Sequence, residues 1–169
     1  MCFSIDTGQP GIIGGQVATY RDCSEAIEDM FEWPTNEAYI VFGEYTIQVM
    51  YKYDLCVMID DIIDMIHQLD VRNSGNCNIE FGSSSFRTGW ELSWNEDDLG
   101  ITAHWESIVC NPKDLVGKTT NISVSKMLFI KEWLKILQVI KSAFDQNQFI
   151  VEDGIPADIE CILEKYQSN

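Results

Sequence analysis

The clearest alternation of apolar and polar residues in the chain runs through residues 89–109. Apolar side chains occupy every second position in residues 90–94 and again in residues 101–105, on either side of the acidic segment Asn95–Asp98. A period of two residues places one set of side chains on the buried face of a sheet. The pattern predicts a β-hairpin with an acidic loop that Gly100 helps to turn. Because three of the five tryptophans lie in it, we expect this hairpin to form the centre of the core.

Other segments with strand-like patterns lie on both sides of this hairpin. The expected strands are Cys2–Ile5, Gln16–Tyr20, Glu37–Glu44, Tyr45–Tyr53, Asn78–Phe81, Thr119–Val124 and Phe149–Val151. A glycine-rich turn is expected between the first two of them. The segment Tyr45–Tyr53 alternates without interruption, so Tyr51 and Tyr53 are expected on the same face. Residues 70–78, which include Gly75, are expected to form a turn.

Two longer segments have apolar residues at steps of three and four, which is the spacing of one helix face. The first is Asp54–Leu69, and its opposite face carries three acidic residues, Asp60, Asp61 and Asp64. The second is Lys126–Asp145, which follows Ser125, a favourable N-cap residue. We expect both segments to be helices packed on the sheet.

Two shorter helices complete the pattern. Asp22 or Ser24 is expected to cap one that runs through Phe31, because Glu25 follows Asp22 at the spacing of a capping box. The other is expected over Ala157–Tyr166. Together these elements predict an α+β fold in a single domain, residues 1–169. It would have a mostly antiparallel sheet of six to eight strands, with two longer and two shorter helices packed on it.

Composition adds one unusual property, a strong excess of acid. The 169 residues are 46% hydrophobic and 11% aromatic, which is ample for a core, and the formal net charge is −16. Residues 1–111 hold 19 acidic and 4 basic side chains, whereas residues 112–169 hold 8 and 7. Like charges at this density repel one another, but they also aid solubility and attract cationic partners. Direct binding of nucleic acid requires a basic surface and is disfavoured.

The cysteines and the hydropathy predict a reducing compartment. Six widely separated cysteines form no CxxC pair: Cys2, Cys23, Cys56, Cys77, Cys110 and Cys161. The first residues, MCFSID, have neither the basic nor the apolar region of a signal peptide. No apolar run approaches the roughly 20 residues of a membrane span. We therefore expect reduced thiols, no membrane association and a cytoplasmic location.

Acidic and histidine motifs offer little material for catalysis. Residues 60–64 match the DDxxD pattern of prenyl-diphosphate enzymes, but the solvated side of an amphipathic helix accounts for the same spacing. His104 and Glu106 resemble the HxE motif of zinc deaminases, without the Pro-Cys-x-x-Cys run that must accompany it. We expect His104 to pair with Glu106 or with another neighbour. No catalytic residue, metal site or cofactor is expected, and the chain is not expected to be an enzyme.

Two stretches carry a family resemblance. They are WELSWNEDDLGITAHW in residues 90–105 and SVSKMLFIKEWLKILQVIKSAF in residues 123–144. Both are similar to stretches in bacterial immunity proteins of polymorphic-toxin and contact-dependent growth inhibition systems. The resemblance covers most of residues 78–145. It implies binding to a cognate protein toxin, often a basic nuclease, and blocking of the toxin's active site or of its access to substrate. It implies no particular contact residues, because these families use different surfaces.

The charge distribution indicates where such a contact would lie. The expected partner-binding residues are Glu25, Glu28, Asp29, Asp60, Asp61, Asp64, Glu96, Asp97 and Asp98. Two alternatives remain open. One is a non-enzymatic adaptor or regulatory domain whose acidity serves solubility alone. The other is a small-ligand-binding domain with a pocket lined by Tyr51, Trp90 or Trp105.

Overall fold

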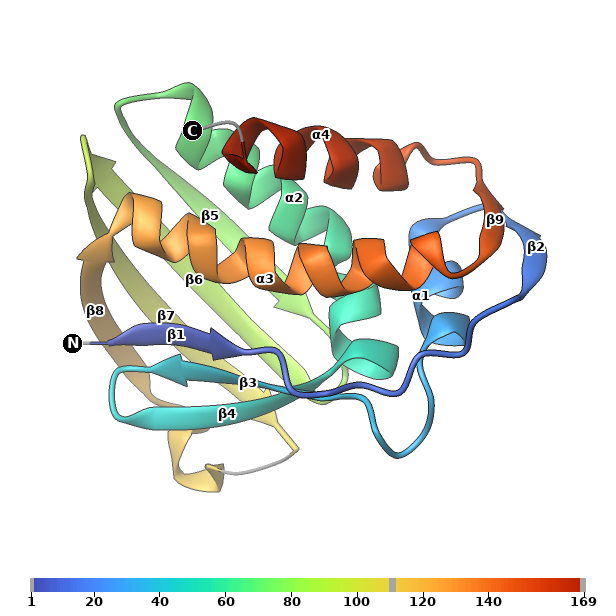
Figure 1. Ribbon diagram of the computed structural model, residues 1–169. Coiled ribbons are helices and arrows are strands. Elements are labelled where there is room, and N and C mark those ends of the chain that lie inside the picture. The colour runs from blue at the N-terminus through green and yellow to red at the C-terminus, as the bar shows by residue number, and fades with distance from the viewer. Residues whose placement is uncertain (1, 110–111, 168–169) are drawn as a thin grey trace.

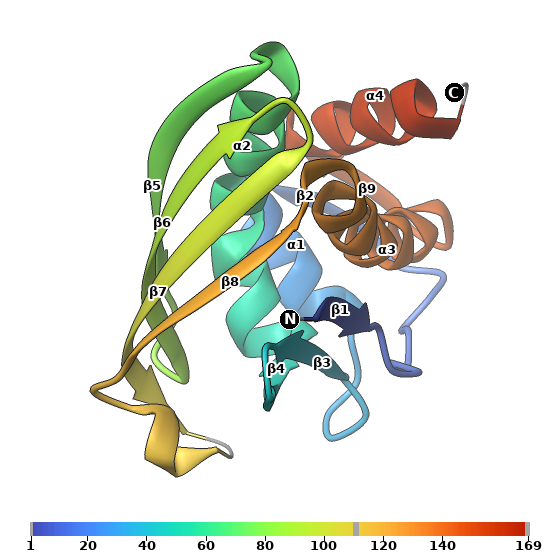
Figure 2. The ribbon, with the colours of Figure 1, turned by 90° about the vertical axis from the view of Figure 1, so that its left-hand side faces the viewer.

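A curved, four-stranded antiparallel sheet forms one side of the molecule, and the four α-helices lie on one face of it (Figures 1 and 2). The computed structural model describes residues 2–109 and 112–167. The strand order in this sheet is β5-β6-β7-β8. Its strands are β5 (Ser74–Gly82), β6 (Phe86–Asn95), β7 (Asp98–Ile108) and β8 (Thr119–Ser125).

The other five strands form two smaller sheets. One is antiparallel with the order β1-β3-β4, and the other is a parallel pair of β2 and β9. Their bounds are β1 (Phe3–Asp6), β2 (Val17–Tyr20), β3 (Glu37–Phe42), β4 (Tyr45–Met50) and β9 (Gln148–Val151). The predicted α+β class is therefore confirmed, with the strands divided among three sheets instead of joined in one. Local alternation identifies a strand but not its partner, so the sequence pattern could not separate the sheets.

The predicted pair of longer and pair of shorter helices is also present. The α-helices are α1 (Cys23–Met30), α2 (Cys56–Val71), α3 (Lys126–Asp145) and α4 (Ile155–Gln167). A π-helical turn, η1 (Tyr51–Leu55), leads into α2, and a 3-10 turn, η2 (Lys113–Leu115), precedes β8. Ser125 caps α3 as predicted, because its hydroxyl accepts the N–H of Leu128 at 3.1 Å.

The β6–β7 hairpin forms the centre of the core, as its tryptophans predict. Trp90 is 1% exposed and lies 5.0–6.3 Å, between ring centroids, from six other aromatic rings. Those rings come from β1, β3, β5, β7 and α3, so one indole joins both antiparallel sheets to the long helix. Its Nε1–H donates to Thr88 at 3.1 Å, which satisfies the polar atom that burial would otherwise leave unpaired.

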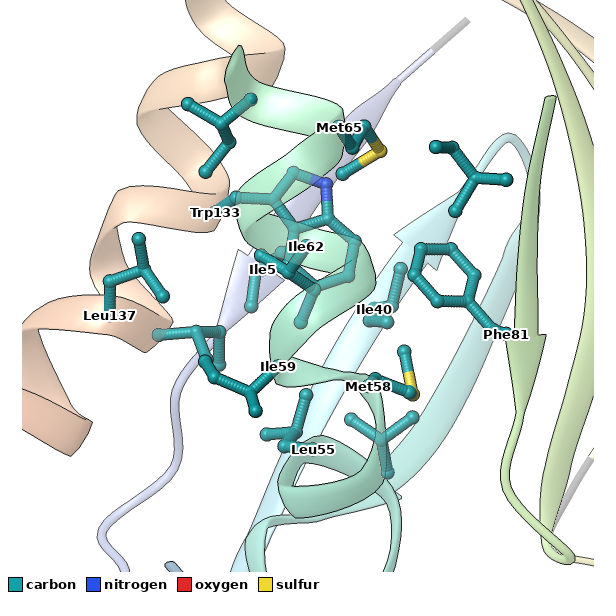
Figure 3. Packing of buried hydrophobic residues seen from close by; sticks show 14 of the residues in the cluster. Ile5, Ile40, Leu55, Met58, Ile59, Ile62, Met65, Phe81, Trp133 and Leu137 are labelled. Carbon is teal, nitrogen blue, oxygen red and sulfur yellow. The ribbon is translucent and has the colours of Figure 1, made fainter. Parts of the chain in front are cut away.

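Helix α2 contributes one apolar side to this core. Ile59 and Ile62 of α2 lie toward Trp133 and Leu137 of α3 (Figure 3), and all four side chains are buried. This packing uses the face that the steps of three and four predict. The other side of α2 remains for solvent or for a partner.

The turn of the β6–β7 hairpin differs from the expectation. Gly100 lies inside β7, paired with Ser93, and the chain turns at Glu96 and Asp97. Glu96 takes the left-handed conformation, with φ of 55°, which is unfavourable for a residue with a side chain. Neighbouring elements hold this turn: the N–H of Glu96 donates to the Asn73 carbonyl at 2.7 Å.

Three other expectations are wrong at specific residues. The first two strands are not neighbours, since β1 pairs with β3 and β2 pairs with β9. The predicted strand Tyr45–Tyr53 ends at Met50, because the Asp54 carboxylate accepts the Met50 N–H at 2.9 Å where η1 begins. Residues 74–78 belong to β5, not to a turn. Few of them are apolar, because one face of this sheet is open to solvent.

Candidate functional site

Helix α1 packs against α2. The predicted carboxylates of α1, which are Glu25, Glu28 and Asp29, thus lie on a helix that adjoins the one with Asp60, Asp61 and Asp64. Asp22 caps α1, with its carboxylate accepting the N–H of Glu25 at 3.0 Å. Asp153, from the loop between β9 and α4, accepts the N–H of Cys23 at the same helix end. A helix N-terminus attracts negative charge, so both carboxylates stabilise α1. They also add to the negative potential around Asp60 in the adjoining helix.

One side of η1 and α2 is exposed over several turns. At about 100° per residue, five positions share this side. They are Tyr53, Val57, Asp60, Asp61 and Asp64, and we call them the α2 stripe. All are exposed except Asp61, which is half-buried. The stripe therefore contains two apolar or aromatic side chains at one end and three carboxylates beyond them.

The carboxylates of the α2 stripe are close enough to perturb one another. Partial burial, followed by the charges of Asp153, Asp64 and Asp22, raises the pKa of Asp60 above its ordinary value. Partial burial, followed by the charges of Asp60 and Asp64, raises the pKa of Asp61. A raised carboxylate pKa means that the ionised form is disfavoured in the folded state. A cation placed here would relieve the repulsion among these carboxylates.

Few cations lie near these carboxylates. Residues 22–33 contain five acidic side chains and residues 51–64 contain four, one of them the buried Asp54, against a single basic residue, Lys52. Lys52 directs its Nζ to the Glu28 carbonyl at 2.7 Å. Within residues 2–109 and 112–167, no ion pair within 4.0 Å involves an acid of these two segments.

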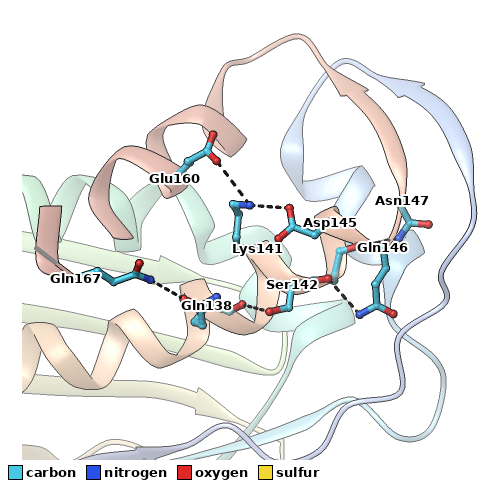
Figure 4. A network of polar contacts seen from close by, with 9 residues as sticks. Gln138, Lys141, Ser142, Asp145, Gln146, Asn147, Glu160 and Gln167 are labelled. Atoms are coloured by element: carbon cyan, nitrogen blue, oxygen red, sulfur yellow. Dashed lines mark hydrogen bonds and ion pairs between the residues drawn. The ribbon is translucent and has the colours of Figure 1, made fainter. Parts of the chain in front are cut away.

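The ion pairs of the molecule lie elsewhere, and most involve α3 and α4. Lys141 of α3, for example, binds Asp145 at 2.6 Å and Glu160 of α4 at 3.7 Å (Figure 4). Lys165 of α4 binds Asp70 at the end of α2. The basic residues of the C-terminal third are thus largely engaged with acids of their own surroundings, whereas the acids of α1 and the α2 stripe keep their charge uncompensated.

The three predicted carboxylates of α1 point to two sides of that helix. Asp29 accepts the Tyr20 hydroxyl at 2.8 Å. Burial, this hydrogen bond and the nearby charges of Asp29 and Glu25 raise the pKa of Tyr20 to about 12. Glu28 faces the start of α2, where burial and then its charge contribute to raising the pKa of Cys56 to about 11. Of the three, Glu28 is the one that flanks the α2 stripe.

The hairpin tip is separate from this cluster and is used differently. Asp97 accepts the N–H of Met127 at 2.9 Å, and its carbonyl accepts the N–H of Lys126 at 2.6 Å, so the tip caps the start of α3. Hydrogen bonding to Ser125 and to the Met127 N–H lowers the pKa of Asp97. Glu96 and Asp98 are exposed beside it, at the end of the sheet away from α1 (Figure 1).

An exposed aromatic pair that the sequence pattern did not predict lies at the Tyr53 end of the α2 stripe. Trp33 is 64% exposed and Tyr53 is 41% exposed, and their ring centroids lie 5.7 Å apart at 67°. The uninterrupted alternation of Tyr45–Tyr53 predicts Tyr53 on the same face as Tyr51, but in the π-helical turn Tyr53 is exposed while Tyr51 stays buried. The one available signal was Trp33 itself, an aromatic residue next to Pro34 between a helix and a strand.

A buried carboxylate below this surface was also missed. Asp54 is 1% exposed and accepts hydrogen bonds from the hydroxyls of Ser83 and Ser85 as well as from the Met50 N–H. These three donors compensate a buried charge. They join η1, which carries Tyr53, to the loop between β5 and β6. Asp54 therefore has a structural part in the site.

The other candidate motifs form ordinary surface contacts. His104 lies 3.2 Å from Glu91 and 3.0 Å from Thr119, so it pairs with neighbouring strands and not with Glu106. In the described parts of the chain, no three His, Cys, Asp or Glu side chains are arranged to hold a metal ion. Five described cysteines have free thiols, and Cys110 lies outside the described residues.

The rings proposed to line a ligand pocket are packed in the core. Tyr51, Trp90 and Trp105 are 0%, 1% and 2% exposed. An open groove of about 450 Å³ does lie on the uncovered face of the large sheet, where Asn78, Glu91 and other polar residues line it. Its lining lacks the aromatic surface that this alternative required.

None of the helices in residues 2–109 and 112–167 is long and apolar enough to cross a membrane. Comparisons of the chain with protein-family models, with curated proteins and with solved structures found no match.

Proposed function

We propose that this chain is an immunity protein that binds a basic toxin domain through the acidic surface of α1 and α2 and thereby neutralises it in the cytoplasm. The observation that carries the proposal is a set of four carboxylates, Glu28, Asp60, Asp61 and Asp64, which are exposed or half-buried and form no ion pair among the described residues. Repulsion among the three aspartates makes a cationic partner favourable at this place.

The chemistry of the partner follows from the charge. A nuclease presents Lys and Arg side chains to phosphate groups, so a protein that offers carboxylates competes for the same side chains. Electrostatic steering accelerates such an encounter to 10⁸–10⁹ M⁻¹s⁻¹ at low salt, compared with about 10⁵–10⁶ M⁻¹s⁻¹ without it. Speed is important for a cell that must inhibit a toxin before its substrate is cut.

We narrow the proposed contact set. Asp60, Asp61 and Asp64 share one side of α2 and Glu28 lies on the adjoining α1, whereas Asp97 is engaged with α3. We therefore centre the contact on α1 and α2 and leave the hairpin tip outside it. Glu25 and Asp29, on the Tyr20 side of α1, contribute to the field around the contact.

The test is the rate of binding to the toxin domain encoded next to this chain's gene, measured at low and high salt. The variant Asp60→Asn/Asp61→Asn/Asp64→Asn should lower the association rate by about tenfold at low salt. The matched control Glu80→Gln/Glu91→Gln/Glu106→Gln removes three charges from the uncovered sheet face and should change it far less. Absence of binding, a rate that salt does not change, or equal effects of the two variants would contradict the proposal.

A further inference from the structure

The most unusual side chain on the surface is Trp33. The other four tryptophans are 0–5% exposed, whereas Trp33 is 64% exposed. Burial of a large apolar side chain stabilises the folded state, so leaving an indole in water forfeits much of that stabilisation. Trp and Tyr are also the residues most enriched among binding hot spots. The position of Trp33 therefore points to a partner.

The exposed pair stands on a rigid base. Two residues before each of its members, Phe31 and Tyr51 form a second ring pair that is fully buried, with centroids 4.6 Å apart and nearly parallel at 27°. Thus the same two chain segments make one ring pair inside the core and another at the surface.

Asn36 ties these two segments together further. It is 0% exposed, its carbonyl accepts the Tyr51 N–H at 2.9 Å and its side-chain oxygen accepts the Lys52 N–H at 3.3 Å. The backbone that carries Trp33 and Tyr53 is therefore fixed before any partner arrives, which reduces the entropy lost on binding.

Acidic residues adjoin this pair along the chain. Glu32 precedes Trp33 in the chain, Glu28 lies one turn earlier on α1, and the α2 stripe continues from Tyr53 through Val57 to its three aspartates. Aromatic faces attract cations, and the guanidinium group both stacks on rings and forms paired hydrogen bonds with carboxylates. An ammonium group is more strongly hydrated and gains less from stacking.

We propose that Trp33 and Tyr53 are the affinity anchor of the interface and that they receive an arginine side chain of the basic partner. This rests on the proposed function for the identity of the partner. The acidic residues set the rate at which the partner arrives, and the ring pair sets how long it stays. The two roles are separable, because steering changes the association rate and a buried anchor changes the dissociation rate.

The first test uses the toxin domain encoded next to the gene. Trp33→Ala and Tyr53→Ala should each raise the dissociation rate by about 30-fold, the equivalent of a hot-spot residue, with the association rate changed by less than about threefold. Leu128→Ala is the matched control, since Leu128 is 61% exposed at the start of α3, and it should change neither rate. The thermal unfolding midpoint of each variant checks that the fold is kept. If the toxin binds and Trp33→Ala dissociates at the wild-type rate, the anchor is overturned while the proposed function stands.

The second test needs neither the toxin nor a variant. An arginine-rich peptide should protect the indole emission of the wild-type protein from acrylamide quenching, because Trp33 is the accessible indole. A lysine peptide of equal length and charge should protect several-fold less at the same concentration. Equal protection by both peptides overturns the arginine assignment, and no protection by either overturns the anchor. If the toxin does not bind, the proposed function fails, and this measurement still decides the role of the ring pair.

Discussion

The carboxylates of the α2 stripe repel one another, whereas the carboxylate of Asp97 at the β6–β7 tip is bound. Burial and neighbouring aspartates raise the pKa of Asp60 and Asp61, and hydrogen bonds at the start of α3 lower the pKa of Asp97. The α2 stripe keeps its carboxylates close together although their ionised form is disfavoured, because other contacts stabilise the fold. The hydrogen bonds of Asp97 at the β6–β7 tip contribute to that stability. An acidic residue is therefore available to a partner only where the fold has not already used it.

Paired charges of α3 and α4 extend this comparison. Lys141 contacts Asp145 within α3 and joins α3 to α4 through Glu160 (Figure 4), so its charge is committed within the molecule. Exposed pairs of this kind contribute little, about 0–1 kcal/mol each. They do, however, partly neutralise the surface of α3 and α4, whereas residues 22–33 and 51–64 hold nine acidic side chains against the single basic residue Lys52.

The largest effect is expected where the support of the α2 stripe is removed. Asp54→Ala leaves two serine hydroxyls and the Met50 N–H without their acceptor. We expect a loss of about 3 kcal/mol or more in the free energy of unfolding, since each unsatisfied buried group costs about 1–3 kcal/mol. Urea denaturation measures it. Ser85→Ala, which removes one donor and keeps the charge paired, is the control and should lose about 1 kcal/mol. A loss smaller than about 1 kcal/mol for Asp54→Ala would show that η1 does not depend on this carboxylate.

A smaller effect separates the tip from the stripe. Asp97→Ala removes the acceptor for the Met127 N–H and should lower the free energy of unfolding by about 1 kcal/mol, the usual value of a helix cap. Asp98→Ala, one residue away in β7 and without this contact, is the matched control and should be near neutral. Toxin association should change little in either variant. A decrease in binding as large as that of the α2 triple variant would place the tip inside the interface.

The smallest effect has the opposite sign. Asp60→Asn/Asp61→Asn should raise the free energy of unfolding at pH 7 by a few tenths of a kcal/mol, since solvent screens these exposed groups. Both folded-state pKa values are raised, so the native protein binds these protons more readily than the unfolded chain does. The destabilisation of the wild type is present at neutral pH and fades as pH falls through the folded pKa values.

The gain from the Asp60→Asn/Asp61→Asn variant should therefore vanish at acidic pH. The contribution of Asp97 behaves in reverse: it is present above the ordinary aspartate pKa and is lost as pH falls through the lowered folded value. Urea denaturation of the wild type, of Asp60→Asn/Asp61→Asn and of Asp97→Ala between pH 3 and pH 7 measures both trends. Stabilisation by Asp60→Asn/Asp61→Asn that persists unchanged at low pH would mean that repulsion is not its cause.

The sequence carries enough local information for the helices and for most strands. Asp22 and Ser125 cap α1 and α3 as predicted, because a cap and its helix lie within a few residues. The separation of the sheets could not be predicted, since β1 and β2 find their partners far along the chain. The roles within the candidate site also depend on contacts between residues far apart in the sequence. Asp97 is engaged because α3 begins beside it, and the turn η1, which carries Tyr53, is held by the hydroxyls of Ser83 and Ser85 on Asp54.

The attachment of β2 and α1 to residues 148–153 has a consequence for synthesis. Strand β2 pairs with β9, and the N–H of Cys23 is bound by Asp153, 130 residues later. A ribosome must deliver the chain as far as Asp153 before α1 gains these partners, so the surface of α1 and α2 is completed late in folding. Chains that stop before β9 would lack these supports.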